Sequence, residues 1–345
     1  MRHADVIVVG TGVMGAATAR SLARAGRRVV ALEQFEVGHP RGSSHGASRI
    51  FRFSYPDPRY VRMAMDSLPL WRELERETGE SLLSVTGGLD TGKDLDEHAS
   101  ALEANGATFE WLDAASLAGR YPALALPHGA RALFQPDAGF VAAAPAWRAL
   151  ARSASANGAE LRQGVTVQGL GEEGGMATIR LDGESLRAPV AVVTAGGWAR
   201  GLLAPVGVDL PTRVTRETVA YFHLPEEEEI PSVVDWGDPA VYALRSPGQG
   251  LKVGEHRAGP DTDPDERGEV SQGSVGRIRE WVRERYPTAD PAPHLAETCL
   301  YTNTADEEFI VERRGPFVIG SPCSGHGFKF APLIGRRLAG LATTG

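Results

Sequence analysis

Three glycines near the start of the chain have the spacing of a phosphate-binding turn. Gly10, Gly12 and Gly15 form GxGxxG directly after the apolar run 6–9. The first glycine allows a tight bend, the second lets backbone approach a pyrophosphate, and the third lets a helix pack closely on the strand. The helix amides then point at the phosphates, with the positive end of the helix dipole behind them. This spacing predicts a dinucleotide site.

An acidic residue completes the pattern at the end of the next apolar segment. Glu33 lies 18 residues after Gly15 and is placed to accept hydrogen bonds from a ribose diol. The glycines alone are weak evidence, and a plain glycine-rich turn is the alternative. Residues 5–33 add a strand, a helix, a second strand and a terminal acid in the expected order. The whole segment therefore favours dinucleotide binding.

Lysine is rare in this chain, and its positions point to chemistry. Of 36 basic residues, three are lysines: Lys93, Lys252 and Lys329. Lysine is a compact point charge whose pKa shifts readily, which arginine does not provide. Because the chain otherwise uses arginine for positive charge, a lysine at a given position suggests a requirement that arginine does not meet. The alternative is that the three positions arose by chance.

The elements that must position these residues alternate between helical and extended patterns. Helices are predicted over 60–78, 94–106, 113–119, 143–157 and 271–286 and from about 331, and strands over 84–91, 159–168, 176–181, 187–194 and 316–320. Residues 212–256 alternate as antiparallel strands do. A βαβ pattern recurs at the start, middle and end, which predicts a mixed α/β fold. In it, a Rossmann-like nucleotide domain is interleaved with an antiparallel-sheet domain.

A long segment between the second strand and the first long helix is unusually polar. Residues 37–60 are rich in Gly, Ser, His and Arg. We expect this segment to be too polar for the core and, because it is long, to have a binding role.

Composition limits the possible partners and the location. A length of 345 residues suggests two domains, and a net charge of −8 argues against a nucleic-acid partner. No apolar run approaches the length of a membrane span. The first strand begins at about residue 5, which leaves no room for a signal peptide. Two cysteines fit a reducing compartment, so we expect a cytoplasmic protein without membrane contact.

Five motifs carry a resemblance that covers nearly the whole chain. They are GTGVMG (10–15), GSSHGASRIFR (42–52), KVGEH (252–256), TCLYTNTADEEFI (298–310) and SGHGFKF (324–330). With them, the chain resembles the monomeric sarcosine oxidase and N-methyltryptophan oxidase family, within the D-amino-acid-oxidase-like flavoproteins. The resemblance implies bound FAD and a flavin domain joined to a sheet-based substrate domain. The FAD domain is expected at 1–84, 141–213 and 300–345, and the substrate domain at 85–140 and 214–299.

The resemblance also implies a covalent flavin. Cys299 stands where the family has the cysteine that forms a thioether to a flavin methyl group. Because the thiolate is the nucleophile, nearby positive charge is expected from His45 and Arg49. A small buried cysteine is the alternative. Cys323 lacks this context, and we expect it to be inert.

The family motif near the C-terminus implies further contacts with the flavin. The expected cofactor-binding residues there are Gly325, His326, Gly327, Phe328 and Lys329. We expect His326 to shape this loop and not to take part in the chemistry. The helix that follows is expected to direct its positive end at the pyrimidine ring of the flavin.

Two cationic residues match those that bind the substrate carboxylate in the family. Arg52 offers a planar fork for a carboxylate, and Lys329 adds a second charge. A surface arginine and a lysine in a loop salt bridge are the alternative. The resemblance thus implies an amino-acid substrate.

A third cation and two neighbours match residues around the reacting centre. Lys252 matches the lysine that promotes reaction with oxygen, since a fixed cation stabilises developing superoxide. His256 alternates onto the same strand face as Lys252 and is expected beside the substrate. Tyr242, on the preceding strand, resembles a substrate-pocket tyrosine. Glu255 stands where the family often has an aromatic residue. We expect it to border the pocket, so that the substrate differs from sarcosine.

Together these motifs predict an FAD-dependent oxidase of N-methyl or cyclic secondary amino acids, without a metal and expected to be a monomer. The amine carbon gives a hydride to the flavin, water hydrolyses the imine, and oxygen is reduced to hydrogen peroxide. Three alternatives keep the fold: a dehydrogenase with another electron acceptor, a biosynthetic oxidase of a cyclic imino acid, and a flavin-binding subunit without turnover. An NAD-dependent dehydrogenase is conceivable from GxGxxG alone, but leaves the C-terminal motifs unexplained.

Overall fold

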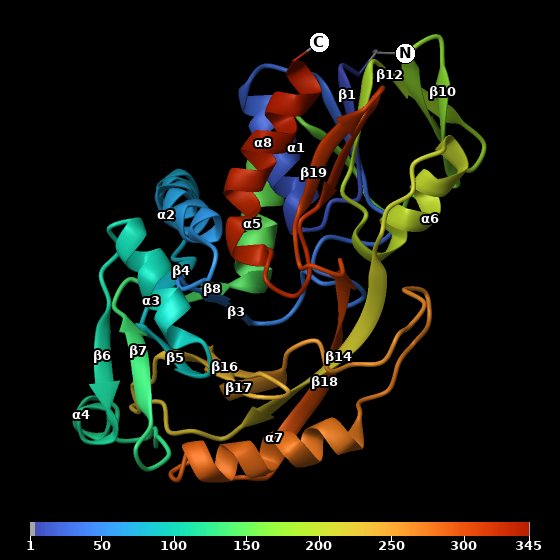
Figure 1. Cartoon of the computed structure of the whole chain (residues 1–345). Coiled ribbons are helices and arrows are strands. Elements are labelled where there is room, and N and C mark those ends of the chain that lie inside the picture. The colour runs from blue at the N-terminus through green and yellow to red at the C-terminus, as the bar shows by residue number, and fades with distance from the viewer. Residues whose placement is uncertain (1–3, 345) are drawn as a thin grey trace.

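The computed structural model describes residues 4–344. Within that range, two large β-sheets form the upper and lower parts of the molecule as Figure 1 shows it. The upper sheet has six strands and the lower has eight. Two three-stranded sheets, β10-β11-β12 and β3-β8-β4, complete the described β-structure.

The six-stranded sheet carries the glycine turn. Its order is β19-β20-β13-β1-β2-β9, with bounds Ile310–Arg314, Phe317–Ser321, Val190–Val193, Val6–Val9, Val29–Leu32 and Glu160–Arg162. β1 pairs in parallel with β2 and with β13, and β19 pairs antiparallel with β20 at the edge. β1 is buried at every position, because layers cover the sheet on both faces.

Helices cover one face of this sheet and a small sheet covers the other. α1 (Val13–Arg24), α5 (Ala143–Ala156) and α8 (Ala331–Thr343) lie together in Figure 1. A Cβ at Gly335 would lie 2.7 Å from the Cβ of Ala17, so α1 and α8 pack at close range. The other face is covered by a three-stranded sheet and three short helices. They are β10 (Gly169–Glu173), β11 (Met176–Arg180), β12 (Ser185–Ala188), η1 (Gly196–Trp198), α6 (Ala199–Leu203) and η2 (Ala204–Val206).

The eight-stranded sheet forms the floor of the molecule in Figure 1. Its order is β18-β14-β17-β16-β15-β5-β7-β6, with bounds Pro293–Asn303, Arg213–Phe222, Gly250–Glu255, Val241–Ser246, Ser232–Trp236, Gly88–Gly92, Arg131–Gln135 and Glu110–Asp113. α7 (Gln272–Arg285) covers its outer face through the buried side chains of Ile278 and Val282. α3 (Leu95–Ala104) and α4 (Ala114–Arg120) flank the end that carries β5, β7 and β6.

A small sheet and a long helix lie between the two large sheets. The sheet contains β3 (Ser48–Phe51), β8 (Gly139–Ala142) and β4 (Leu83–Val85). The helix, α2 (Pro58–Thr78), begins at Asp57, whose carboxylate accepts from the amide of Arg59, and ends at Gly79 with φ +73°. These two features are the usual start and stop signals of a helix.

The structure confirms the predicted helices to within two residues at most ends. The strand predicted over 84–91 is two strands, β4 and β5, which belong to different sheets because Gly87 (φ +80°) turns the chain between them. The segment 187–194 is likewise divided between β12 and β13. The expectation that 37–60 is too polar for the core was wrong, since this segment forms β3 and buries several side chains: His45, Ser48, Phe51, Arg52, Phe53, Ser54 and Tyr55.

The limits between the FAD domain and the substrate domain remain a prediction. The limit at 299/300 falls inside β18, and the outermost residues 1–3 and 345 lie outside the described range. None of the helices within residues 4–344 is both long and apolar enough to span a bilayer.

Candidate active site

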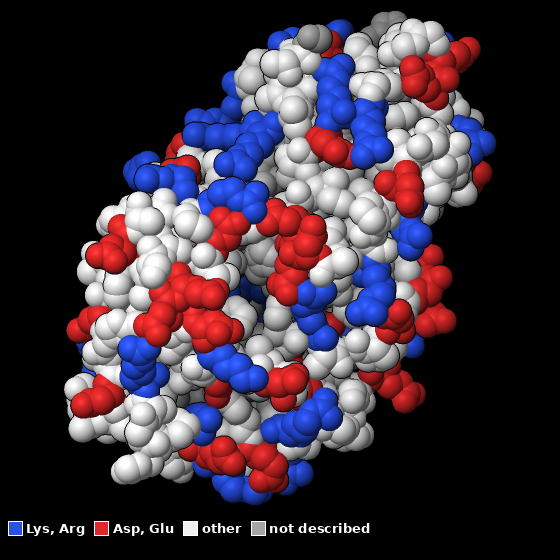
Figure 2. Space-filling model, viewed as in Figure 1, with Lys and Arg blue, Asp and Glu red and all other residues white. Residues whose placement is uncertain are grey.

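A cavity of about 910 Å³ lies between the two large sheets. The glycine turn, the 42–60 segment, β16, β17, β18 and the 320–329 loop all contribute to its lining. Figure 2 shows a hollow in the middle of one face, with acidic side chains around it. The acidic residues that line the cavity besides Glu33 are Asp57, Asp94, Glu97, Asp265, Asp306, Glu307 and Glu308.

The glycine turn borders one end of this cavity with the geometry that the sequence predicts. Gly10 has φ +86°, and a Cβ at Gly15 would lie 1.9 Å from the carbonyl oxygen of Gly10. Only glycine allows this close approach of helix and strand. The amide of Val13, in the first turn of α1, donates to Ser44 Oγ at 3.0 Å. Gly12, Val13 and Met14 also line the cavity, so the turn places the N-terminus of α1 beside it.

Glu33 lines the same end, at the carboxyl end of β2. Its carboxylate accepts from the amides of Thr11 (2.9 Å) and Phe35 (3.1 Å), and His39 Nε2 lies 3.5 Å away. Burial alone would raise the pKa of Glu33, but these contacts outweigh it and lower the pKa. Glu33 is therefore an ionised acceptor beside the glycine turn.

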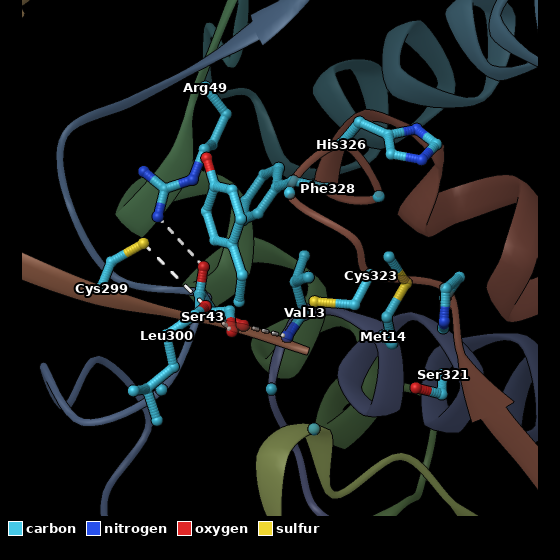
Figure 3. Close-up of a pocket in the computed structure, with 18 of the residues that line it drawn as sticks. Val13, Met14, Ser43, Arg49, Cys299, Leu300, Ser321, Cys323, His326 and Phe328 are labelled. Atoms are coloured by element: carbon cyan, nitrogen blue, oxygen red, sulfur yellow. Dashed lines mark hydrogen bonds between the residues drawn. The ribbon is translucent and has the colours of Figure 1, made fainter. Parts of the chain in front are cut away.

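Cys299 lies on β18 opposite Glu217 and is buried. Figure 3 shows the guanidinium of Arg49 on the same side of the pocket as the Cys299 sulfur. Burial raises the pKa of this thiol, while Arg49 and Lys252 act in the opposite direction. Arg49 itself is held by three backbone carbonyls, those of Ser43, His45 and Ser48.

His45 does not supply the positive charge that was expected from it. Its side chain is buried, and desolvation with the nearby Arg49 and Lys252 lowers its pKa to about 3. The imidazole is therefore neutral at physiological pH. Cys323, expected to be inert, lines the same cavity, and the amide of Thr302 donates to its sulfur at 3.4 Å.

Strand β17 and the residue directly after it each supply one side chain to the cavity. Lys252 and His256 line it, as the strand period predicts. Lys252 is 3% exposed, and its ammonium reaches the carbonyl of Ser48 at 3.4 Å. Burial, assisted by Arg49, lowers the pKa of Lys252 to about 7. This lysine is therefore poised between its charged and neutral forms near physiological pH.

His256 pairs with a carboxylate from the loop after β18. His256 Nε2 lies 3.7 Å from Glu307 Oε2, and Arg257 contacts the other carboxylate oxygen. Hydrogen bonding from His256 lowers the pKa of Glu307 to about 2. Arg257 and Glu307 both have positive φ, 56° and 63°. Such backbone is rare outside glycine and is concentrated at functional sites.

Tyr242 lines the cavity from β16, directly opposite Gly254. Glu255, expected to border the pocket, points away from it. Its carboxylate accepts from Arg277 at 2.6 and 2.7 Å and from Ser274 Oγ at 2.5 Å, both on α7. The expectation was wrong because consecutive residues of a strand face opposite sides of the sheet.

Arg52 and Lys329 come together at the other end of the cavity. Lys329 Nζ donates to Tyr55 Oη at 2.7 Å and to the carbonyl of His326 at 2.9 Å. Arg52 lies between two aromatic rings, 4.4 Å from the centre of Tyr55 and 5.1 Å from that of Trp236. Burial, with the nearby Arg52, lowers the pKa of Lys329 well below its usual value. Two converging cations of this kind suit an anion.

The 325–329 loop borders the cavity with all five predicted residues. Gly325 has φ +79°, and a Cβ there would lie 2.2 Å from the ring of Tyr301. Burial and the charge of Lys329 lower the pKa of His326 to about 3, so its ring is neutral. Figure 3 shows Phe328 beside the arm of Arg49, whose guanidinium lies 5.8 Å from its ring centre.

The sequence did not identify three further residues that line the cavity: Tyr55, Trp236 and Glu307. Tyr55 lies in the polar segment 37–60 and Glu307 lies in the motif 298–310, so both could have been considered. Nothing in the sequence around Trp236 points to a role in the site. Lys93, the third lysine, is exposed at the cavity. All three lysines of the chain therefore line one cavity, which strengthens the argument from lysine scarcity.

Comparison with known proteins defines the class. The model of the FAD dependent oxidoreductase family matches residues 5–341, and the chain belongs to this family. It is an FAD-dependent amine oxidoreductase of the sarcosine-oxidase-like type. The human peroxisomal sarcosine oxidase is 34% identical, over 97% of this chain and 90% of that protein. The monomeric sarcosine oxidase of Bacillus sp. (strain B-0618) is 32% identical, over 99% and 93%.

Among solved structures, NikD, described as an unusual amino acid oxidase essential for nikkomycin biosynthesis, superposes with a TM-score of 0.90. It shares 28% identity, and the match covers 99% of this chain and 94% of NikD. The L-proline dehydrogenase of P. horikoshii has a TM-score of 0.89 at 21% identity, which shows a common fold.

Proposed function

We propose that this protein oxidises N-methyl or cyclic secondary amino acids and passes the electrons to oxygen, forming hydrogen peroxide. One observation carries the proposal: a single cavity is lined by the glycine turn, by Cys299 and Lys252, and by the cation pair Arg52 and Lys329. It thus combines groups suited to a dinucleotide, to oxygen and to a carboxylate.

The residues present fit an FAD. A side chain at Gly10 or Gly15 would collide with neighbouring backbone, so the turn stays as tight as a dinucleotide site requires. The ionised carboxylate of Glu33 would accept hydrogen bonds from the ribose. Two hydroxyls that line the cavity, Ser48 Oγ and Ser321 Oγ, are buried without a partner in the described part of the chain. Buried polar groups normally have a partner, so these oxygens suit a polar ligand. Bound flavin would supply the two-electron chemistry, accepting a hydride from the amine carbon.

Cys299 is proposed to hold the flavin through a thioether. Its formation would exchange the S–H bond and one methyl C–H bond for a C–S bond, and the two protons and two electrons released would reduce oxygen to hydrogen peroxide. The reaction needs the thiolate, and Arg49 and Lys252 favour that form against the effect of burial. Arg49 is suited to this role because three backbone carbonyls fix the position of its guanidinium. His45, being neutral, would contribute to the local structure without supplying charge.

Arg52 and Lys329 are proposed to bind the substrate carboxylate. Because both cations are almost fully buried, they act in a medium of low dielectric constant, where charge-assisted hydrogen bonds are strong. Fixing the carboxylate at this end places the amine toward the middle of the cavity. Tyr242 would then contribute to the wall around the substrate.

His256 and Lys252 are proposed to serve the proton and the oxygen steps. The amine must be unprotonated to release hydride, and His256 with Glu307 is positioned to take up its proton. Lys252 would stabilise negative charge that develops on oxygen. Water hydrolyses the resulting imine, and an N-methyl substrate would give formaldehyde and the primary amino acid. The protein is further proposed to act as a cytoplasmic monomer.

A peroxide assay tests the proposal. Purified holoenzyme is supplied with N-methyl, cyclic and primary amino acids in air, and peroxide is measured against substrate consumed. We expect one peroxide per substrate for at least one secondary amino acid. Substrate consumption without peroxide, but with an added electron acceptor, would instead identify a dehydrogenase. No consumption of any amino acid would contradict the proposal.

A further inference from the structure

A buried carboxylate next to the cation pair has no part in the function proposed above. Asp90, on β5, is 2% exposed. Its Oδ1 accepts from the indole nitrogen of Trp236 at 2.8 Å and lies 3.6 Å from Arg52 Nη1. Strands β5 and β15 pair in parallel, which brings Asp90 opposite Val234 and close to Trp236. A buried charge is costly unless it is paired, so its presence here needs a reason.

The contacts of Asp90 account for the orientation of Arg52. One guanidinium nitrogen of Arg52 contacts both Asp90 and the carbonyl of Ser54. The rings of Tyr55 and Trp236 cover the guanidinium at 4.4 and 5.1 Å. Asp90 therefore holds Arg52 directly and also through Trp236, the ring on which Arg52 packs. Within residues 4–344 the guanidinium makes no other hydrogen bond, and Arg52 lines the cavity.

Asp90 also acts on the second cation through its charge. Burial and the charge of Arg52 both lower the pKa of Lys329, and Asp90 opposes them. The other polar partners of Lys329, Tyr55 Oη and the carbonyl of His326, are uncharged. The titratable and charged groups on the elements around Lys329 and Asp90 are Arg52, Tyr55, Tyr60, Asp94, His98, His256, Glu307 and His326.

We propose that Asp90 is a positioning residue of the carboxylate site: it holds Arg52 against the cavity wall, directly and through Trp236, and places a negative charge near Lys329. This inference rests on the proposed function, because that function makes Arg52 and Lys329 the carboxylate-binding pair. Arg52 and Lys329 bring two positive charges to this site and Asp90 brings one negative charge. One positive charge is therefore left for the substrate carboxylate to neutralise. The specificity of the site for amino acids thus depends on a residue that does not touch the substrate.

Acetate binding to the holoenzyme tests the proposal without turnover. Acetate is titrated at constant ionic strength between pH 6 and pH 9, and binding is followed by the change in flavin absorbance. Asp90→Asn is compared with wild type and with Asp235→Asn. Asp235 is the matched control, because its carboxylate also accepts from an indole, Trp281 at 2.9 Å, and pairs with an arginine, Arg285 at 3.3 Å. That pair faces α7, outside the cavity.

In Asp90→Asn, the loss of acetate affinity with rising pH should begin at a lower pH than in wild type, because a negative charge near Lys329 is removed. Above the pH at which this loss begins, the variant should bind acetate more weakly than wild type does. Asp235→Asn should behave as wild type does. In a Lys329→Met background, Asp90→Asn should no longer move the pH dependence, because the titrating ammonium is gone. Asp90→Ser is measured in parallel, so that a folding failure of one variant still leaves a neutral residue to test.

Two results would overturn the proposal. In one, Asp90→Asn binds acetate as wild type does across the pH range. In the other, it moves the pH dependence by the same amount in the Lys329→Met background. Wild-type enzyme that oxidises amino acids and binds acetate would, in either case, leave the proposed function intact. Wild-type enzyme that binds no carboxylate would overturn both.

Discussion

Replacing Lys252 by methionine is expected to stabilise the flavin-free protein. The wild-type ammonium is 3% exposed, and burial with the nearby Arg49 lowers its pKa from 10.5 to about 7. Each unit of pKa corresponds to about 1.4 kcal/mol. Holding this charge inside the folded chain therefore costs about 5 kcal/mol of stability when lysine is protonated in both states. Methionine has a similar length and removes that cost.

The effect has a defined pH dependence. Below pH 7 the lysine is protonated in the folded and the unfolded chain, so the full cost applies. Between pH 7 and pH 10.5 the unfolded chain binds one more proton, so wild-type stability rises with pH in this window. The advantage of Lys252→Met should accordingly fall from about 5 kcal/mol at pH 6 to about 2 kcal/mol at pH 9.

Urea unfolding followed by circular dichroism measures this difference. Flavin-free wild type, Lys252→Met and Lys93→Met are compared at pH 6, 7.5 and 9. Lys93 is exposed, so its variant should stay within about 0.5 kcal/mol of wild type at each pH. A Lys252→Met protein that is less stable than wild type at pH 6, or whose gain is the same at every pH, would refute the reasoning. The expected result would show that the chain keeps an unfavourable charge for function.

Three further substitutions test individual contacts. Arg52→Ala should raise the Michaelis constant for an amino-acid substrate about 10- to 150-fold, from the loss of about 1.5–3 kcal/mol of charged hydrogen bonding, with a smaller change in turnover. Cys299→Ser should leave the flavin in the supernatant after acid precipitation, whereas wild-type flavin should stay with the protein pellet. Glu255→Gln should lower the free energy of unfolding by about 1–3 kcal/mol through its lost contacts with Arg277, and the Michaelis constant should not change.

Local patterns predicted the parts of this molecule that depend on local physics. The glycine turn, the long helix α2 and the strand face shared by Lys252 and His256 follow from spacing alone. The same alternation places Glu255 on the opposite face, so the signal against its role in the pocket was already present. The expectation came from the family resemblance, whereas in this chain Glu255 pairs with Arg277 on α7.

Other features depend on contacts between distant segments, which the sequence does not display. Asp90 and Trp236 meet only because β5 and β15 pair in parallel across a long separation in the chain. His45 was expected to be a cation because it lies in the family motif near the flavin, but the folded chain buries it and makes it neutral. Burial of that segment arises from packing between two sheets, and composition alone does not predict it.

The central claim is that one cavity brings a flavin and an amino-acid amine into reactive contact. Mixing the purified holoenzyme with an N-methyl or cyclic amino acid under strict exclusion of oxygen tests it most directly, with the visible flavin absorbance as readout. We expect the absorbance to bleach in proportion to the substrate added and to return when air is admitted. Flavin that stays fully oxidised with every secondary amino acid tried would contradict it.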